Sequence, residues 1–112
     1  MNPRIVFVEL PSTRLADDKA FYATAFGMAF TDFGPTYACT LTGDVDLGFQ
    51  ADAGETTSAP LTVIQVDDLE ATLAAVQATG AEIVKPIFAF PGGRRFHFRD
   101  PSGNELAALK AD

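Results

Sequence analysis

Few side chains in this 112-residue sequence could carry acid–base, nucleophilic or metal chemistry, and their numbers limit that chemistry. His97 is the only histidine, which excludes any metal site built from two or more His ligands of one chain. Cys39 is the only cysteine, which excludes an internal disulfide and any multi-thiolate site. We expect Cys39 to be a small buried hydrophobic residue rather than a nucleophile. For His97, a structural hydrogen bond and a role in proton transfer both remain open.

The second group of chemically capable residues lies near the C-terminus. Arg94, Arg95 and Arg99 fall within six positions of one another, directly after the segment 88–93, Phe-Ala-Phe-Pro-Gly-Gly. This segment could be a lid whose Phe88 and Phe90 close over a ligand, with an adjacent arginine holding a carboxylate or phosphate. It could equally be a hairpin turn whose aromatic side chains lie in the core or at a dimer contact.

Composition and charge narrow the class of protein. Hydrophobic residues make up 47% and charged residues 21% of the chain, which is typical of one globular domain. The net charge of −7 has the wrong sign for binding nucleic acid or an anionic membrane surface. No apolar run approaches the roughly 20 residues of a membrane-spanning helix, and no signal-peptide pattern is present. We therefore expect a soluble, cytoplasmic protein.

The elements that must position these residues follow one order twice. In module one, residues 1–52, we expect a strand at 4–10, a helix at 16–26 ended by Gly27, and strands at 30–33, 37–42 and 45–51. A polar connector, 53–60, separates it from module two, residues 61–112. There we expect a strand at 61–66, a helix opened by Asp67 and Glu70 and ended by Gly80, and strands at 83–88, 94–99 and 105–109.

This order predicts an α+β fold made of two β-α-β-β-β modules. One helix covers only one face of its sheet, so the other face needs a partner. We therefore expect a curved mixed sheet around a concave cleft that could take a small molecule.

The motifs at the two ends of the chain resemble those of one family. Residues 96–106, Phe-His-Phe-Arg-Asp-Pro-Ser-Gly-Asn-Glu-Leu, closely resemble the Asp-Pro-Asp-Gly-Asn turn of the vicinal-oxygen-chelate superfamily. Its members include glyoxalase I, bleomycin-resistance proteins and extradiol dioxygenases. The pairs Phe21-Tyr22 and Phe26-Gly27 are similar to the first helix of the same superfamily. The resemblance implies the fold but not the function, because the superfamily contains both metal enzymes and metal-free binders.

The resemblance also implies where a metal would be held. In the metal enzymes the ligands come from the first and last strand of each module, and the matching positions here are Phe7, Asp46, Leu61 and Ala107. Three of these side chains have no lone pair for a metal. A catalytic zinc site takes about three protein ligands, and an extradiol iron site takes two His and one carboxylate. We therefore expect no metal and no other cofactor.

Period-two alternation indicates which polar side chains share the cleft with these positions. Glu9, Gln65 and Glu105 fall on the predicted cleft side, whereas Phe96 and Phe98 face the helix. Glu9 could instead be neutralised by Arg95 or Arg99, and Asp46 could be a solvated residue beside the turn 43–44. We assign no catalytic residue. The predicted ligand-binding residues are Phe7, Glu9, Asp46, Leu61, Gln65, Phe88, Phe90, Arg95, His97, Glu105 and Ala107.

These expectations favour a metal-free small-molecule binding protein similar to bleomycin-resistance proteins, which would sequester an antibiotic or aromatic metabolite. The carboxylates Glu9, Asp46 and Glu105 would favour cationic or hydrogen-bonding ligands. The alternative is a glyoxalase-like lyase, isomerase or dioxygenase with a non-standard metal site. An interaction domain with a vestigial cavity is a third interpretation. We also expect a homodimer, with Phe7 and Leu61 near its interface.

Overall fold

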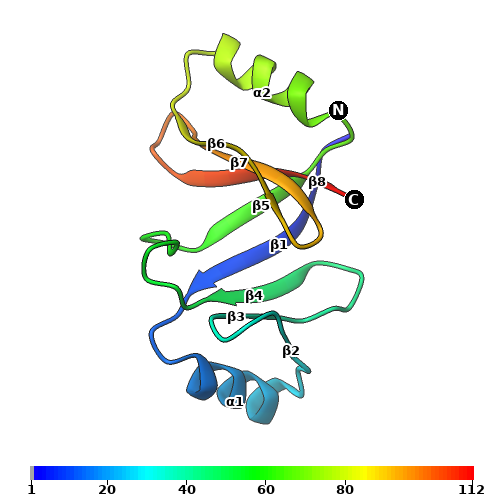
Figure 1. Cartoon of the computed structure of the whole chain (residues 1–112), viewed down its shortest axis with the longest axis vertical. Coiled ribbons are helices and arrows are strands. Elements are labelled where there is room, and N and C mark those ends of the chain that lie inside the picture. Colours follow the sequence, from blue (N-terminus) through cyan, green and yellow to red (C-terminus); the bar gives the residue numbers. More distant parts are fainter. Residues whose placement is uncertain (1) are drawn as a thin grey trace. The chain divides into compact units, whose positions relative to one another are not determined.

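The computed structural model describes residues 2–112 and has an α+β architecture of two β-α-β-β-β modules (Figure 1). The chain divides into two compact units within its first strand. The first unit is Phe7–Pro60, and the second unit comprises Leu61–Asp112 together with the residues up to Val6. In chain order, the elements are β1 (Arg4–Pro11), α1 (Leu15–Phe26), β2 (Thr31–Asp32), β3 (Tyr37–Cys39), β4 (Asp46–Gln50), β5 (Leu61–Gln65), α2 (Leu69–Ala78), β6 (Ile83–Phe90), β7 (Gly93–Arg99) and β8 (Glu105–Ala111).

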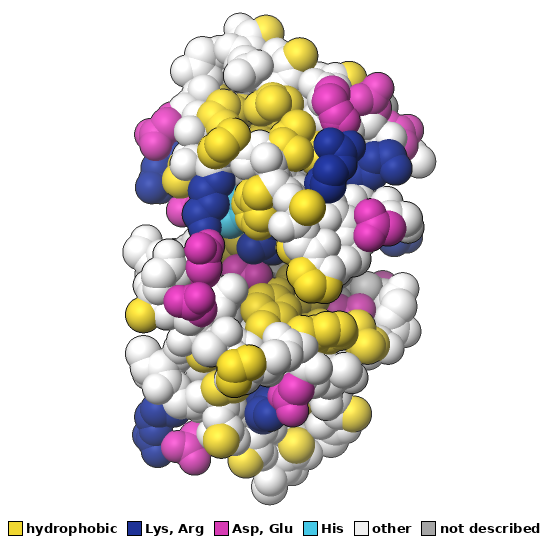
Figure 2. All heavy atoms as spheres, viewed as in Figure 1, with side chains coloured by type: hydrophobic (Ala, Val, Ile, Leu, Met, Phe, Trp, Pro, Cys, Tyr) yellow, Lys and Arg dark blue, Asp and Glu magenta, His cyan; other side chains and the backbone are white. Residues whose placement is uncertain are grey.

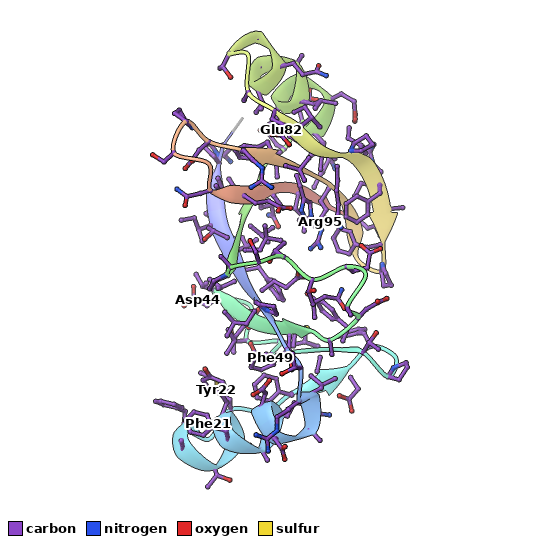
Figure 3. All side chains as sticks on the ribbon, turned by 90° about the vertical axis from the view of Figure 1, so that its left-hand side faces the viewer. Phe21, Tyr22, Asp44, Phe49, Glu82 and Arg95 are labelled. Carbon is purple, nitrogen blue, oxygen red and sulfur yellow. The ribbon has the colours of Figure 1, made fainter. Side chains whose placement is uncertain are left out.

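The first unit has the strand order β2-β3-β4-β1. β1 and β4 run parallel, whereas β2, β3 and β4 form antiparallel pairs. Helix α1 contacts this sheet through aromatic side chains, since the Tyr22 ring lies 5.5 Å from that of Phe49 (Figure 3). The helix ends as predicted at Gly27, whose φ of 69° is a left-handed conformation that glycine adopts without steric cost.

The second unit repeats this arrangement with the strand order β5-β8-β7-β6. β5 and β8 are parallel, and the pairs β6–β7 and β7–β8 are antiparallel. Leu69 of α2 packs with Val66, Phe96 and Ala108 in the core of this unit, and Phe98 lies against the same cluster. The alternation that assigned Phe96 and Phe98 to the helix side is thus confirmed.

Several predicted boundaries are wrong by one to three residues, and three of them have a clear local reason. Helix α2 is capped by Asp68 rather than Asp67, because Asp68 Oδ1 accepts a hydrogen bond from Ala71 N at 2.9 Å. Strand β3 ends at Cys39, and the next residues bond to Asp46 across a turn. Strand β6 continues to Phe90, so Pro91 and Gly92 alone connect β6 to β7. The segment 88–93 therefore contains a hairpin turn at Pro91 and Gly92, and a lid role for Phe88 and Phe90 stays a prediction.

No helix within residues 2–112 is both long and apolar enough to cross a membrane.

Candidate functional site

In the first unit, the predicted site residues Phe7 and Asp46 are direct neighbours on the parallel strands β1 and β4. Two residues further along, Glu9 lies opposite Gly48. A Cβ atom built on Gly48 would lie only 2.4 Å from Cζ of Phe7 and 3.1 Å from the hydroxyl of Tyr37. The Phe7 ring therefore occupies the space that a side chain at position 48 would need.

Glu9 is a buried carboxylate, with 1% of its surface exposed. Its Oε1 accepts a hydrogen bond from the hydroxyl of Tyr37 at 2.8 Å. Tyr37 lies on β3, on the other side of β4 from Glu9. The buried carboxyl group of Glu9 thus has a polar partner within its own unit. Tyr37 was not among the predicted site residues, although it is the one polar aromatic residue of the short strand β3, Tyr-Ala-Cys.

Asp46 is bound by the turn that precedes it. Its Oδ1 accepts hydrogen bonds from Thr40 Oγ1 at 2.8 Å and from the amide and hydroxyl of Thr42 at 2.8 and 2.7 Å. Partial burial raises the pKa of Asp46, but these hydrogen bonds outweigh that effect and hold the pKa below its usual value. The carboxylate thus stabilises the β3–β4 connection, whereas the turn alternative expected it to be solvated.

In the second unit, Leu61 and Ala107 are completely buried. Neither side chain has an exposed surface in the single chain; that Leu61 lies near a dimer interface stays a prediction. Ala107 lies opposite Val63 on β5 and opposite His97 on β7. Val63 and Ala107 thus form a buried apolar row beside His97 in the sheet.

Gln65, at the end of β5, lines a surface depression of about 520 Å³. A second depression, of about 750 Å³, lies between α2 and the turn at 100–103. Neither depression is lined by Arg95 or His97. Figure 2 shows hydrophobic side chains gathered at the level of α2 and β6, with basic side chains beside them. The lining residues of the first depression are Asn2, Pro3, Arg4, Gln65, Val66, Asp67, Lys110 and Ala111.

The β6–β7 hairpin brings Phe88, Phe90 and Arg95 together. Phe88 lies directly opposite Arg95 in the antiparallel register. The Arg95 guanidinium carbon lies 5.3 Å from the centre of the Phe88 ring and 5.4 Å from that of Phe90, within the range of cation–π interactions. Figure 3 shows Arg95 extending from β7 on the side away from α2. Two rings and one guanidinium thus form a single cluster.

His97 is next to this cluster and is paired with Glu105. Its Nδ1 lies 2.7 Å from Glu105 Oε2, and the histidine is fully buried. Its ring centre is 5.7 Å from that of Phe88. Burial lowers the pKa of His97, and the positive charges of Arg95 and Lys85 lower it further. The hydrogen bond and the charge of Glu105 oppose this, but the pKa remains below its usual value. His97 is therefore a neutral imidazole near pH 7.

The strand registers redefine one of the four positions at which the resemblance implies metal ligands. Glu9 is two residues after Phe7 and lies opposite Gly48, whereas Val63 is two residues after Leu61 and lies opposite Ala107. The residue of β4 that corresponds to Ala107 of β8 is therefore Gly48, not Asp46.

These four positions do not fit a metal ion. They carry a phenylalanine, a glycine, a leucine and an alanine, and the phenylalanine ring covers the glycine. Zinc, iron and manganese sites need imidazole, thiolate or carboxylate donors. Within residues 2–112, no group of three or more His, Cys, Asp or Glu side chains is arranged to hold a metal ion. Glu105, two residues before Ala107 on the same strand face, bonds to His97 instead.

A comparison with protein families agrees with the strand order and the motifs. The model of the glyoxalase/bleomycin resistance protein/dioxygenase superfamily matches residues 4–108. The chain belongs to this superfamily. No curated protein matches the sequence.

Solved structures of the superfamily share the fold at low sequence identity. Methylmalonyl-CoA epimerase from Mycobacterium tuberculosis is 14% identical with a TM-score of 0.76, over 96% of this chain and 87% of that one. A superfamily member from Vibrio splendidus is 18% identical with a TM-score of 0.72, over 97% and 99% of the two chains. The Mn(II)-bound glyoxalase from Novosphingobium aromaticivorans is 20% identical with a TM-score of 0.67, over 96% of this chain but 38% of that one. At these identities the likeness is one of fold.

Proposed function

We propose that this superfamily member binds a small organic molecule without a metal ion. The observation that carries the proposal is the side-chain set at the positions where related enzymes place metal ligands: Phe7, Gly48, Leu61 and Ala107. None of these side chains supplies a donor. The two neighbouring carboxylates of the first unit already accept hydrogen bonds, Glu9 from Tyr37 and Asp46 from Thr40 and Thr42. The proposal includes a ligand-binding role for the residues predicted from the sequence to line the cleft.

The side chains around the β6–β7 hairpin support an aromatic ligand. Phe88 and Phe90 supply apolar surface, and Arg95 lies against both rings. Small-molecule sites combine such apolar walls with a few fixed polar groups, here His97 and Glu105. The carboxylates that were expected to favour cationic ligands bond within the protein, which supports aromatic, hydrogen-bonding ligands over basic antibiotics.

A glyoxalase-like metal enzyme is the alternative, and it has support among the structural neighbours. The Novosphingobium glyoxalase is described with bound Mn(II), and an extradiol ring-cleaving dioxygenase from B. fuscum has the same fold with a TM-score of 0.75. Such an enzyme would need donors from positions other than the four described above. Activity that appears only after Mn²⁺, Fe²⁺, Ni²⁺ or Zn²⁺ is added would favour this alternative.

We also propose that the protein is a homodimer. Large hydrophobic side chains are exposed on the single chain, including Ile5 at 54%, Phe21 at 59% and Phe26 at 66%. Exposed apolar groups of this size are typical of surfaces that become covered on association. Light scattering coupled to size-exclusion chromatography tests this, and a monomer at micromolar concentration would contradict it.

The binding proposal is tested by calorimetric titration of the chelator-treated protein with aromatic metabolites and antibiotics. We expect at least one aromatic compound to bind in a one-to-one ratio, and Phe88→Leu to weaken that binding. The matched control is Phe21→Leu, which shortens an exposed aromatic residue on α1 and should leave binding unchanged. A panel without any binding, or equal losses in the two variants, would refute the proposal.

A further inference from the structure

His97 has one ring nitrogen whose role the pairing with Glu105 does not explain. Nδ1 faces Glu105 Oε2, but Nε2 is buried and has no hydrogen-bond partner among residues 2–112. A buried polar atom without a partner costs folding free energy, and such atoms are rare in folded proteins. Such a nitrogen needs an explanation, and a bound molecule that donates a hydrogen bond to it is one.

The pairing determines what Nε2 can bind. A carboxylate only accepts hydrogen bonds, so we assign the ring proton to Nδ1 and the free lone pair to Nε2. Burial lowers the pKa of His97, and Glu105 only partly counteracts this; the positive charges of Arg95 and Lys85 also lower it. The ring therefore stays neutral, and Nε2 acts as a hydrogen-bond acceptor.

The surroundings of the ring restrict the partner further. The Phe88 ring lies 5.7 Å from the His97 ring at an angle of 44°, and Ala107 lies opposite His97 with a small side chain. Lys85 is the β6 residue opposite His97, and Arg95 precedes it by two residues on the same face. Nε2 is buried, so a donor that reaches it must leave water, which costs far more for an ammonium group than for a neutral O–H or N–H. A neutral donor attached to an aromatic ring fits these neighbours.

We propose that Nε2 of His97 accepts a hydrogen bond from a phenolic O–H or a ring N–H of the ligand, while Phe88 contacts the ring that carries it. This inference rests on the proposed function and names the ligand class for the same site. It assigns His97 to recognition, oriented for that purpose by Glu105.

Phenol and anisole form a matched pair of probes, because methylation removes the O–H and keeps the ring. The single histidine allows a direct measurement: protein labelled with ¹⁵N only in histidine, and purified without a histidine tag, gives signals from His97 alone. We expect the free protein to show a proton on Nδ1 and none on Nε2. Phenol should move the Nε2 signal in a saturable way, whereas anisole should leave it in place.

Glu105→Gln tests the orienting role. The glutamine amide can either donate to Nδ1 or accept from it, so the proton position on the ring is no longer fixed. We expect the affinity for phenol to fall by about 2- to 12-fold, the worth of one hydrogen bond, and the Nε2 signal to show both proton positions. Glu82→Gln is the control, because it makes the same substitution at an exposed residue that precedes β6 in the sequence.

Four results would overturn the inference. They are a proton on Nε2 in the free protein, an Nε2 signal that phenol does not move, an equal response to anisole, and unchanged phenol binding in Glu105→Gln. If phenol and anisole shift the backbone signals of the β6–β7 hairpin equally while Nε2 stays fixed, the inference fails and the proposed function stands. If phenol shifts no signal, the inference fails, and the calorimetric panel decides the proposed function separately.

Discussion

Replacing Gly48 by alanine tests whether the Phe7 ring fills the space beside β4. The added Cβ would lie 2.4 Å from Cζ and 2.6 Å from Cε2 of Phe7, well inside van der Waals contact. Gly48 has no positive φ, so the substitution adds no backbone strain and its cost is steric. Overpacking of this kind costs about 1–3 kcal/mol of the free energy of unfolding, and the same Cβ would also lie 3.1 Å from the Tyr37 hydroxyl.

The assay is urea-induced unfolding followed by circular dichroism, because the chain has no tryptophan. In a double-mutant cycle, Phe7→Leu removes the atoms that clash, so Gly48→Ala should cost less in the Phe7→Leu background. We expect a coupling of about 0.5–3 kcal/mol between the two positions. Gly54→Ala is the control, because its Cβ would meet only Asp52 Oδ1 at an ordinary 3.4 Å. A Gly48→Ala protein as stable as the wild type, or fully additive effects, would refute the packing described for Phe7.

Three further substitutions or conditions test other parts of the structure. Gly93→Ala should destabilise the protein at least as much as Gly48→Ala, because its Cβ would lie 2.3 Å from the backbone oxygen of Lys110, which cannot rotate away. Thermal unfolding measures this, and a change in the free energy of unfolding within about 0.5 kcal/mol would contradict it. Asp46→Ala should lower the free energy of unfolding by about 1–2 kcal/mol at pH 7 through lost hydrogen bonds. Because the folded pKa of Asp46 is lowered, the stabilisation by its carboxylate should be lost as the pH falls through that pKa. Urea midpoints of the wild type and of Asp46→Ala that run parallel from pH 7 to 3 would contradict this pH dependence. His97 has a folded pKa below its unfolded value of 6.5, so the unfolded chain binds the extra proton and stability should fall as the pH decreases from about 6.5 towards the folded pKa. Lys85, Arg95 and Glu105 are the charged neighbours of the ring. Urea midpoints of the wild type and of His97→Phe between pH 7.5 and 5.5 should therefore converge at low pH, and a wild type that gains stability there would contradict the prediction.

The order of elements was predictable because local patterns encode it. The end of α1 follows from Gly27, a residue that readily adopts the left-handed conformation found there. The core-facing side of β7 follows from the alternation of Phe96 and Phe98 with polar neighbours, and neither inference needs tertiary information. The cap of α2 was misplaced by one residue, since Asp67 and Asp68 are both suitable capping residues and only the observed bond to Ala71 distinguishes them. Strand ends depend on pairing partners, which is why β6 exceeds its predicted length.

The candidate site was predictable in its residue types but not in its register. Sequence motifs located Phe7, Leu61 and Ala107, but β4 has no motif that determines its offset, and Asp46 was chosen where the register indicates Gly48. A glycine offers no side chain to suggest a role, and the approach of the Phe7 ring to it exists only in three dimensions. The partners of the polar residues, such as Glu105 for His97, likewise come from neighbouring strands rather than from sequence spacing.

The claim that the superfamily's metal positions carry no donors here is tested most directly by the metal content of protein purified without chelators. Elemental analysis should find zinc, manganese, iron and nickel far below one ion per chain. Titration with each ion should leave the His97 nitrogen signals unchanged. One tightly bound transition-metal ion per chain, with His97 or a neighbouring carboxylate shifted on its removal, would contradict the account.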